Sequence, residues 1–173
     1  LKLFDDDLKS PNSKDALDVK KEADKGNIDA IIQYAQMLLT GYGAIMNKSE
    51  ALKYFKKAVD LGDHNSMYIY AHCLRHGEGI ETNIEEAVKY YKMAASLGNS
   101  RAMINLAHMY RSGKEIPQNT AEAVKYYEQS ISHGNTNAMI NLGYMMYYGE
   151  GIPPNKDKGK FYLKKAADSG NNQ

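Results

Sequence analysis

Apolar and polar positions follow the period of an α-helix along much of this chain, most clearly between Asn83 and Asn99. The polar face of that stretch carries Lys89 and Lys92. The opposite face combines small and aromatic side chains, those of Ala87, Tyr90, Tyr91, Ala94 and Ala95. Asn83 is a preferred helix-capping residue, and Gly98 suits the left-handed conformation that ends a helix. The pattern predicts one amphipathic helix with both of its ends encoded locally.

The same stretch recurs every 36 residues, and glycines mark the register: Gly26, Gly62, Gly98, Gly134 and Gly170. Each repeat contains a second amphipathic pattern, for example residues 101–112. A loop with two glycines and an isoleucine, such as residues 77–80, separates the two patterns. We therefore predict a helical hairpin in every repeat, with a first helix (helix A) and a second helix (helix B).

The predicted organisation has four full repeats with partial repeats at both ends. Residues 12–17 match residues 47–52, so residues 1–25 are interpreted as an N-terminal partial repeat or capping helix. Asp5–Asp7 within them is expected to be a solvated surface run. The full repeats are assigned to 26–61, 62–97, 98–133 and 134–169, and residues 170–173 begin a truncated further repeat. Because helical repeat arrays need polar caps, we expect the array to continue in the parent protein.

Composition narrows the possible functions. The chain has 173 residues with 22 basic and 21 acidic side chains, so no overall charge attracts nucleic acid or an anionic membrane. No apolar run approaches the roughly 20 residues that span a bilayer, and membrane insertion is not expected. The single cysteine, Cys73, excludes an internal disulfide and is expected to be a buried apolar residue. An unpaired cysteine slightly favours the cytoplasm.

Three patterns suggest chemistry that the repeat explains more simply. Tyrosine pairs such as Tyr90 and Tyr91 resemble stacking platforms, but their helical spacing favours a packed core. His72 and His76 share a helix face, and His108 lies one repeat further; yet adjacent repeats are about 10 Å apart, and no carboxylate completes a zinc site. The Gly-x-Gly loop follows a helix rather than a strand, which is a weak phosphate-binding signal. With no catalytic constellation, neither enzymatic activity nor a cofactor is expected.

Residues 138–152 and 86–95 carry the pattern Ala-x-x-x-Leu-Gly/Ala-x-x-Tyr-x-x-Gly-x-Gly-Ile and then Ala-x-x-Tyr-Tyr-x-x-Ala-Ala-x-x-Gly. This pattern resembles the Sel-one-like repeat (SLR) family, a relative of tetratricopeptide repeat proteins, over nearly the whole chain. The resemblance implies an all-α, right-handed α-solenoid of antiparallel helix pairs, with helices A on the concave side. It also implies an adaptor that binds other proteins. A cysteine-rich branch with a disulfide in each repeat does not fit a chain with one cysteine.

The chain departs from this pattern in two repeats. Glu115 replaces the second loop glycine in the third repeat, and Lys158 and Gly159 replace Glu and Ala in the fourth. The last B helix thereby loses a capping partner and carries a glycine that costs about 1 kcal/mol of helix stability. We expect that helix to be the loosest.

Candidate binding residues are those that the helical period leaves unburied on the A helices. Amide side chains both donate and accept hydrogen bonds, so Asn105 and Asn141 are expected to hold the backbone of an extended peptide. Ile69, Tyr144 and Tyr148 are expected to take its apolar side chains. The complete set comprises Gln33, Gln36, Ile69, His72, His76, Arg101, Asn105, His108, Asn137, Asn141, Tyr144 and Tyr148.

The predicted function is a non-enzymatic scaffold or adaptor that captures a peptide or partner protein in the concave groove of the A helices. Three alternatives stay open: a targeting module of a larger enzyme, a binder of small molecules or cell-wall fragments, and a rigid spacer. The sequence names neither the partner nor the oligomeric state.

Overall fold

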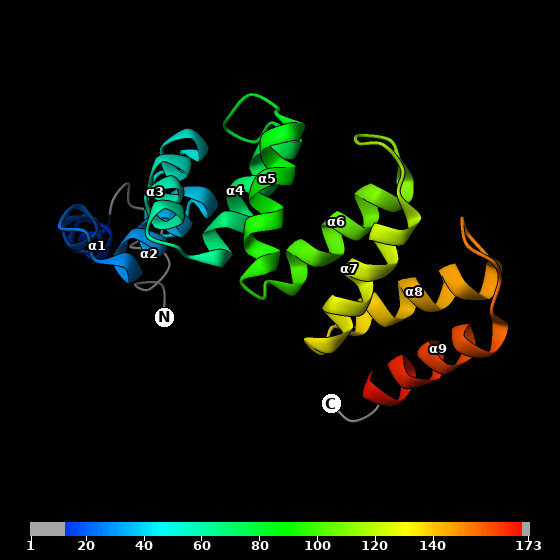
Figure 1. The fold of residues 1–173 in the computed structure, drawn as a ribbon. Coiled ribbons are helices and arrows are strands. Elements are labelled where there is room, and N and C mark those ends of the chain that lie inside the picture. The colour runs from blue at the N-terminus through cyan, green and yellow to red at the C-terminus, as the bar shows by residue number, and fades with distance from the viewer. Residues whose placement is uncertain (1–12, 171–173) are drawn as a thin grey trace. The chain divides into compact units, whose positions relative to one another are not determined.

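The structure is a computed structural model that describes residues 13–170. The described chain contains α-helices and no strand. Figure 1 shows them in chain order: α1 (Lys14–Asp24), α2 (Ile28–Thr40), α3 (Lys48–Asp60), α4 (His64–His76), α5 (Ile84–Ser96), α6 (Ser100–Ser112), α7 (Thr120–Ser132), α8 (Thr136–Tyr148) and α9 (Lys156–Gly170). Helices α2, α4, α6 and α8 are the predicted A helices, and α3, α5, α7 and α9 are the B helices. The all-α repeat fold is confirmed.

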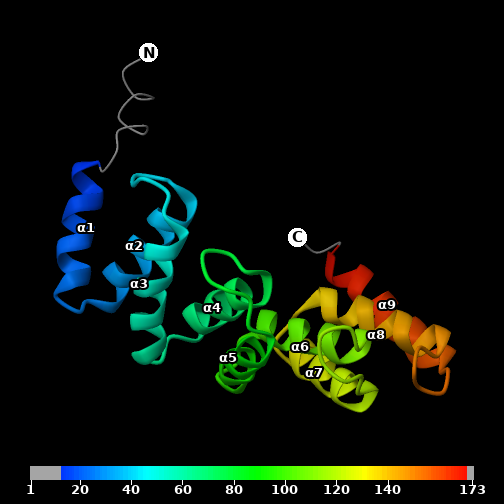
Figure 2. The same ribbon diagram turned by 90° about the horizontal axis from the view of Figure 1, so that it is seen from above.

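The chain forms two compact units, residues 1–90 and residues 91–173. In the first unit, α1 packs on α2, α2 on α3, and α3 on α4. In the second unit, α6 packs on α7, α7 on α8, and α8 on α9. The two views in Figures 1 and 2 show the helices of the hairpins α2–α3 and α8–α9 side by side. All of these pairs are consecutive in the chain, as expected of a repeat array.

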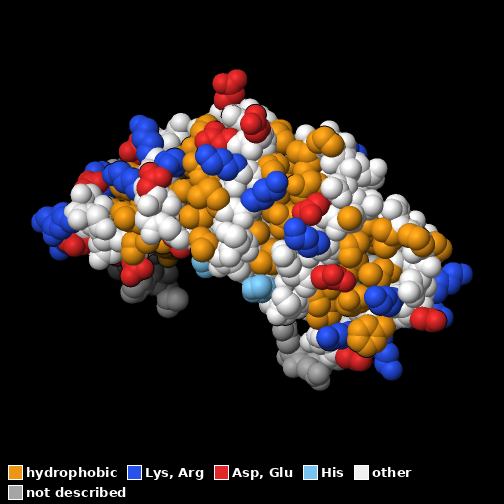
Figure 3. Space-filling model, viewed as in Figure 1, with side chains coloured by type: hydrophobic (Ala, Val, Ile, Leu, Met, Phe, Trp, Pro, Cys, Tyr) orange, Lys and Arg blue, Asp and Glu red, His pale blue; other side chains and the backbone are white. Residues whose placement is uncertain are grey.

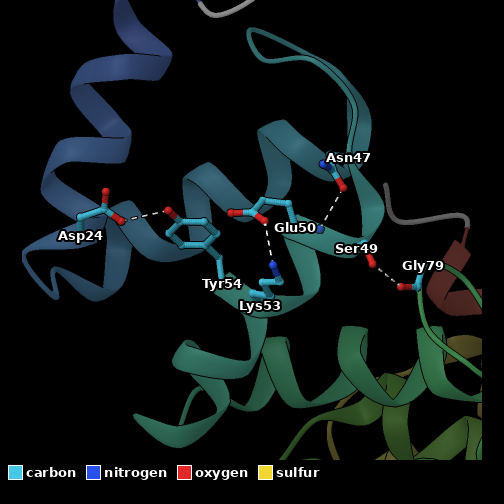
Figure 4. Close-up of polar contacts among 7 residues, drawn as sticks. All are labelled: Asp24, Asn47, Ser49, Glu50, Lys53, Tyr54 and Gly79. Atoms are coloured by element: carbon cyan, nitrogen blue, oxygen red, sulfur yellow. Dashed lines mark hydrogen bonds and ion pairs between the residues drawn. The ribbon is translucent and has the colours of Figure 1, made fainter.

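Asparagine and glycine residues set the helix ends where the sequence predicts them. The Asn47 side chain accepts a hydrogen bond of 3.0 Å from the backbone N–H of Glu50, which caps α3 (Figure 4). Asn83 and Asn119 make the same contact at α5 and α7. Gly98, just after α5, has a φ of 90°, in the left-handed region.

Tyrosine, alanine and methionine form the core, as the helical period indicates. In the first unit, the rings of Tyr34 and Tyr54 meet edge to face with their centroids 4.9 Å apart. The Tyr54 hydroxyl donates a 2.9 Å hydrogen bond to Asp24 at the end of α1 (Figure 4). In the second unit, Tyr127 and Leu142 are fully buried in one cluster. Tyr90, Tyr91 and Cys73 are buried too, so the core assignment of the tyrosine pair and the cysteine is confirmed.

In three of the hairpins, the loop after the first helix is held by a hydroxyl group about 30 residues earlier in the chain. The Ser49 hydroxyl donates to the carbonyl oxygen of Gly79 over 2.9 Å (Figure 4). Ser13 bonds to Gly43 and Thr120 to Gly151 in the same way, each over 3.1 Å. Gly79 has a φ of 75°, and a Cβ there would lie 2.7 Å from the Cβ of Lys48. Only glycine combines this conformation with so close an approach.

The last hairpin is packed more closely than the sequence suggests. A Cβ on Gly159 of α9 would lie 2.8 Å from the Gly143 carbonyl oxygen and 2.8 Å from the Tyr147 Cβ on α8. Asn155 still caps α9, because its side chain accepts from the backbone N–H of Lys158 over 3.0 Å. The glycine that we expected to loosen this helix thus permits close contact between two helices.

Three sequence predictions lie wholly or partly outside the described residues. These concern residues 1–12, which include Asp5–Asp7, and residues 171–173 of the truncated further repeat. Within the described chain, none of the helices has the length and hydropathy that crossing a membrane requires.

Candidate functional site

The A helix of the second repeat, α4, borders a pocket of about 310 Å³ in the first unit. One apolar wall comes from Leu39 on α2, and another from Tyr68 and Ile69 on α4. The remaining lining residues are Lys48, His72, Cys73 and Glu78. A pocket with apolar walls and a few polar groups has the general composition of a binding site.

The polar rim of this pocket is an ion-paired cluster. The Lys48 Nζ lies 2.8 Å from Glu78 Oε2, and the His72 Nδ1 lies 4.0 Å from Glu78 Oε1. The Lys48 ammonium lowers the pKa of Glu78, which keeps this carboxylate charged. Both side chains of the Lys48–Glu78 pair are more than a third exposed, so the pair orients the rim more than it stabilises the fold.

His72 is the titratable group closest to the physiological range in this cluster. Burial and, after it, the neighbouring His76 lower the pKa of His72, since both disfavour the charged imidazolium. The His72 and His76 ring centroids are 4.4 Å apart. His72 is therefore a neutral donor and acceptor at neutral pH. Burial raises the pKa of Cys73 to about 11, so its thiol is protonated and unreactive.

The predicted binding residues of the first unit lie on the A helices as expected but differ in exposure. Gln33, Gln36 and His76 are exposed. Ile69 and His72 are half-buried, because Ile69 packs against the core and His72 lines the pocket. The helical period does not predict this partial burial, although neither side chain is fully buried. Their partial burial places them inside a pocket.

In the second unit the predicted residues form a mixed polar and aromatic surface. Arg101, Asn137, Tyr144 and Tyr148 are exposed, and Asn105, His108 and Asn141 are half-buried. The Tyr144 and Tyr148 rings are nearly parallel, with centroids 6.2 Å apart, and these residues are 47% and 67% exposed. The structure thus leaves an aromatic pair in solvent on an A helix.

Two of these side chains are more constrained than the sequence suggests. The His108 ring lies against Tyr127, with centroids 5.7 Å apart, so it is partly core rather than a groove residue. The Asn141 amide donates a 2.8 Å hydrogen bond to the Asn137 carbonyl oxygen one turn earlier. The side-chain oxygen and the second N–H of Asn141 take no part in this hydrogen bond.

Sequence reasoning missed Leu39, Lys48, Tyr68 and Glu78 of the pocket. These residues come from three helices (α2, α3 and α4) and the loop after α4, which meet only when consecutive repeats pack. One usable signal was the loop itself, because Glu78 stands between two glycines and Glu150 recurs at the same place in the fourth repeat. Loop residues of one repeat contact the B helix of the repeat before it.

No cluster of three or more His, Cys, Asp or Glu side chains that could hold a metal ion occurs within residues 13–170. On the face drawn in Figure 3, basic and acidic side chains are interspersed among apolar ones rather than separated by sign. This distribution agrees with the near balance of charges in the sequence.

Comparisons with known proteins identify the repeat. The Sel1 repeat matches residues 28–63, 64–99, 100–135 and 136–171. These ranges begin two residues after those of our division, in the same register. A comparison with curated protein sequences found no significant match.

Solved structures show the same fold. The Sel1 repeat protein of Oxalobacter formigenes has a TM-score of 0.81 and 28% identity, over 88% of this chain and 62% of that chain. The protective antigen c5321 of uropathogenic Escherichia coli, described as an SLR fold, has a TM-score of 0.80 and 23% identity, over 88% and 33%. Cysteine rich protein B of Helicobacter pylori has a TM-score of 0.55 and 23% identity, over 69% and 93%.

The chain spans less than two thirds of the length of the first two of these structures. The matched repeats, however, cover most of the chain's own residues and coincide with the helical hairpins described above. The chain belongs to the Sel1 repeat family.

Proposed function

We propose that this protein is a non-enzymatic scaffold that binds an extended segment of a partner protein along its A helices. Sel1 repeats generally mediate protein–protein interactions, and scaffolds of this family are typically non-catalytic. The proposal that the A helices bind this segment rests on the pocket on α4, which combines apolar walls with a polar rim.

The pocket's chemistry suits one side chain of a bound segment together with the backbone beside it. Leu39, Tyr68 and Ile69 provide apolar surface for an aliphatic or aromatic side chain. Burying such a side chain contributes about 1.5–3 kcal/mol. His72 and Glu78 at the rim are placed to bond to the peptide N–H and C=O groups that accompany it.

The second unit offers a complementary surface of its own. Asn105 and the Asn141 side-chain oxygen provide hydrogen-bonding groups on α6 and α8. The exposed Tyr144 and Tyr148 rings provide flat apolar area at a low cost in side-chain entropy, which makes tyrosine common in interfaces.

The test is recovery of a crosslinked partner from the native cell with matched variants. Ile69→Asp places a charge in the pocket, and Asn105→Ala with Asn141→Ala removes the predicted backbone contacts. Lys57→Ala changes an exposed residue on α3, outside the pocket. We expect the partner to be lost or reduced with the first two variants and retained with the third.

Each variant is first shown to keep its helical content by circular dichroism. Equal recovery of the partner by all folded variants would place the binding surface elsewhere. Loss with Lys57→Ala alone would assign binding to the B helices.

A further inference from the structure

A second pocket, of about 340 Å³, lies in the second unit on the side of the B helices. It is formed by the last turns of α5, the turn that follows α5, the start of α6 and one face of α7. Its floor is apolar and consists of Ala95 and Met103, both buried. The other lining residues are Lys92, Ser96, Gly98, Lys125, Tyr126, Gln129 and His133.

The charged side chains that line this pocket are basic. Lys92 comes from α5 and Lys125 from α7, and no carboxylate belongs to the lining. Glu122 lies 3.2 Å from the Lys125 Nζ but outside the lining, one turn earlier on α7. Two cations from separate helices therefore border one cavity, in a protein whose total charge is close to zero.

Neighbouring aromatic rings keep these ammonium groups near the cavity. The Lys125 Nζ is 5.5 Å from the Tyr126 ring centroid, and the Lys92 Nζ is 5.9 Å from that of Tyr110. The Tyr110 and Tyr126 rings are stacked 6.0 Å apart, nearly parallel. A hydrogen bond with Tyr110 raises the pKa of Lys92, so this lysine stays charged.

His133 also lines the cavity, and the backbone holds its ring in place. Its Nδ1 is 2.9 Å from the Gln129 carbonyl oxygen, which can only accept, so Nδ1 carries a proton and donates. The Nε2 atom faces Gly98, where an added Cβ would lie 3.4 Å away. Nε2 is thus the ring nitrogen that remains to form a hydrogen bond with a ligand.

We propose that this pocket binds a phosphate monoester. The Lys92 and Lys125 ammonium groups pair with its oxygens, and one proton is shared between the third phosphate oxygen and His133 Nε2. A phosphate monoester can bring such a proton when it binds, because its second pKa of about 6 lies within about one pH unit of neutrality. Sulfate has the same shape but no proton to share, and a carboxylate has too few oxygens to reach all three groups.

The site is separate from the residues of the proposed function, since none of its lining residues belongs to the pocket on α4 or to the predicted binding residues of the A helices. The phosphate can belong to a phosphorylated side chain of a partner protein or to a small phosphate monoester. The chemistry at the pocket is the same for both, and a direct titration distinguishes them.

The experiment is titration of the complete, isotopically labelled protein, followed by amide chemical shifts. The probes are inorganic phosphate, sulfate, a short phosphoserine peptide and the same peptide with serine. We expect phosphate and the phosphopeptide to change the amide chemical shifts of Gly98 and His133. Sulfate and the serine peptide should leave these chemical shifts unchanged. Tighter binding of the phosphopeptide than of phosphate assigns the site to a protein partner, and equal affinity assigns it to a small monoester.

Matched variants separate a site from general charge attraction. Lys92→Met with Lys125→Met should weaken phosphate binding by at least about tenfold, which corresponds to about 1.4 kcal/mol. Lys160→Met with Lys164→Met removes the same charge from exposed positions on α9 and should leave the affinity unchanged. Equal shifts with sulfate, or equal losses in both double variants, would overturn the proposal. An unchanged dispersion of the remaining amide signals shows that each variant is folded.

Discussion

Ser66 on α4 is a fully buried serine whose hydroxyl has no hydrogen-bond partner. Its backbone N–H is used by the cap, since it donates to the Asp63 side chain over 2.6 Å. The equivalent positions of the other A helices are alanines, namely Ala30, Ala102 and Ala138, and these are also buried. Ser66→Ala therefore removes a buried, unpaired polar atom and leaves the residue that the other repeats use.

The expected effect is stabilisation. Leaving a buried hydroxyl unpaired costs about 1–3 kcal/mol, and alanine is a better helix former than serine by about 0.5 kcal/mol. The loss of a few contacts around the oxygen offsets part of this gain. We expect the free energy of unfolding to rise by about 1–2 kcal/mol, and the melting temperature by about 2–8 °C for a chain of this size.

Ser130 on α7 is the matched control. It is as buried as Ser66 and occupies a position that is alanine in the other B helices, but its hydroxyl donates to the Ser100 carbonyl oxygen over 3.1 Å. Ser130→Ala removes a satisfied hydrogen bond and leaves a carbonyl without that donor. We expect it to lower the free energy of unfolding by about 0.5–1.5 kcal/mol.

The assay is urea unfolding followed by far-ultraviolet circular dichroism, with the slope against urea compared between variants. A shared slope shows that the same surface is exposed on unfolding. The reasoning would be refuted if Ser66→Ala were destabilised, or if both serine variants changed stability in the same direction by similar amounts.

Two further predictions follow from contacts within single units. Gly159→Ala should lower the free energy of unfolding by about 1–3 kcal/mol in thermal melts, because the steric conflict with Gly143 and Tyr147 outweighs the helix propensity of alanine; an increase in stability would contradict the close packing of α8 and α9. Tyr54→Phe should raise the pKa of Asp24, which the Tyr54 hydroxyl lowers together with the larger effect of a neighbouring lysine. The stability that this carboxylate contributes is present above its unfolded pKa and is lost as pH falls through its folded pKa, so the loss should be smaller and complete at a higher pH in the variant. Carboxyl chemical shifts measured against pH check this shift, and identical titration curves would argue against the hydrogen bond.

The fold was predictable because its information is local and repeated. Each Asn cap and each terminal glycine acts within a few residues, and the 36-residue period gives the same signal several times. The burial of Tyr90 and Tyr91 followed from the helical period alone. Local patterns of this kind do not depend on how one repeat meets the next.

The candidate sites were less predictable because they depend on contacts between elements. Lys48 and Glu78 are 30 residues apart and meet only because the loop of one repeat packs on the B helix of the previous one. His108 has a polar side chain at a solvent position of the helical period, yet the Tyr127 ring covers it in part. Gly159 has an unfavourable helix propensity, and only its close approach to α8 shows why a glycine fits there.

The hydrogen bond from Ser49 to Gly79 has a consequence for exchanging repeats between proteins of this type. A segment cut at the glycines of the 36-residue period separates the donor from its acceptor, since one lies before Gly62 and the other after it. A transferable module therefore runs from the hydroxyl residue that begins one B helix to the loop glycine that follows the next A helix. Chimeras joined within this module should misplace the loop, whereas chimeras joined between the loop glycine and the start of the following B helix should preserve it.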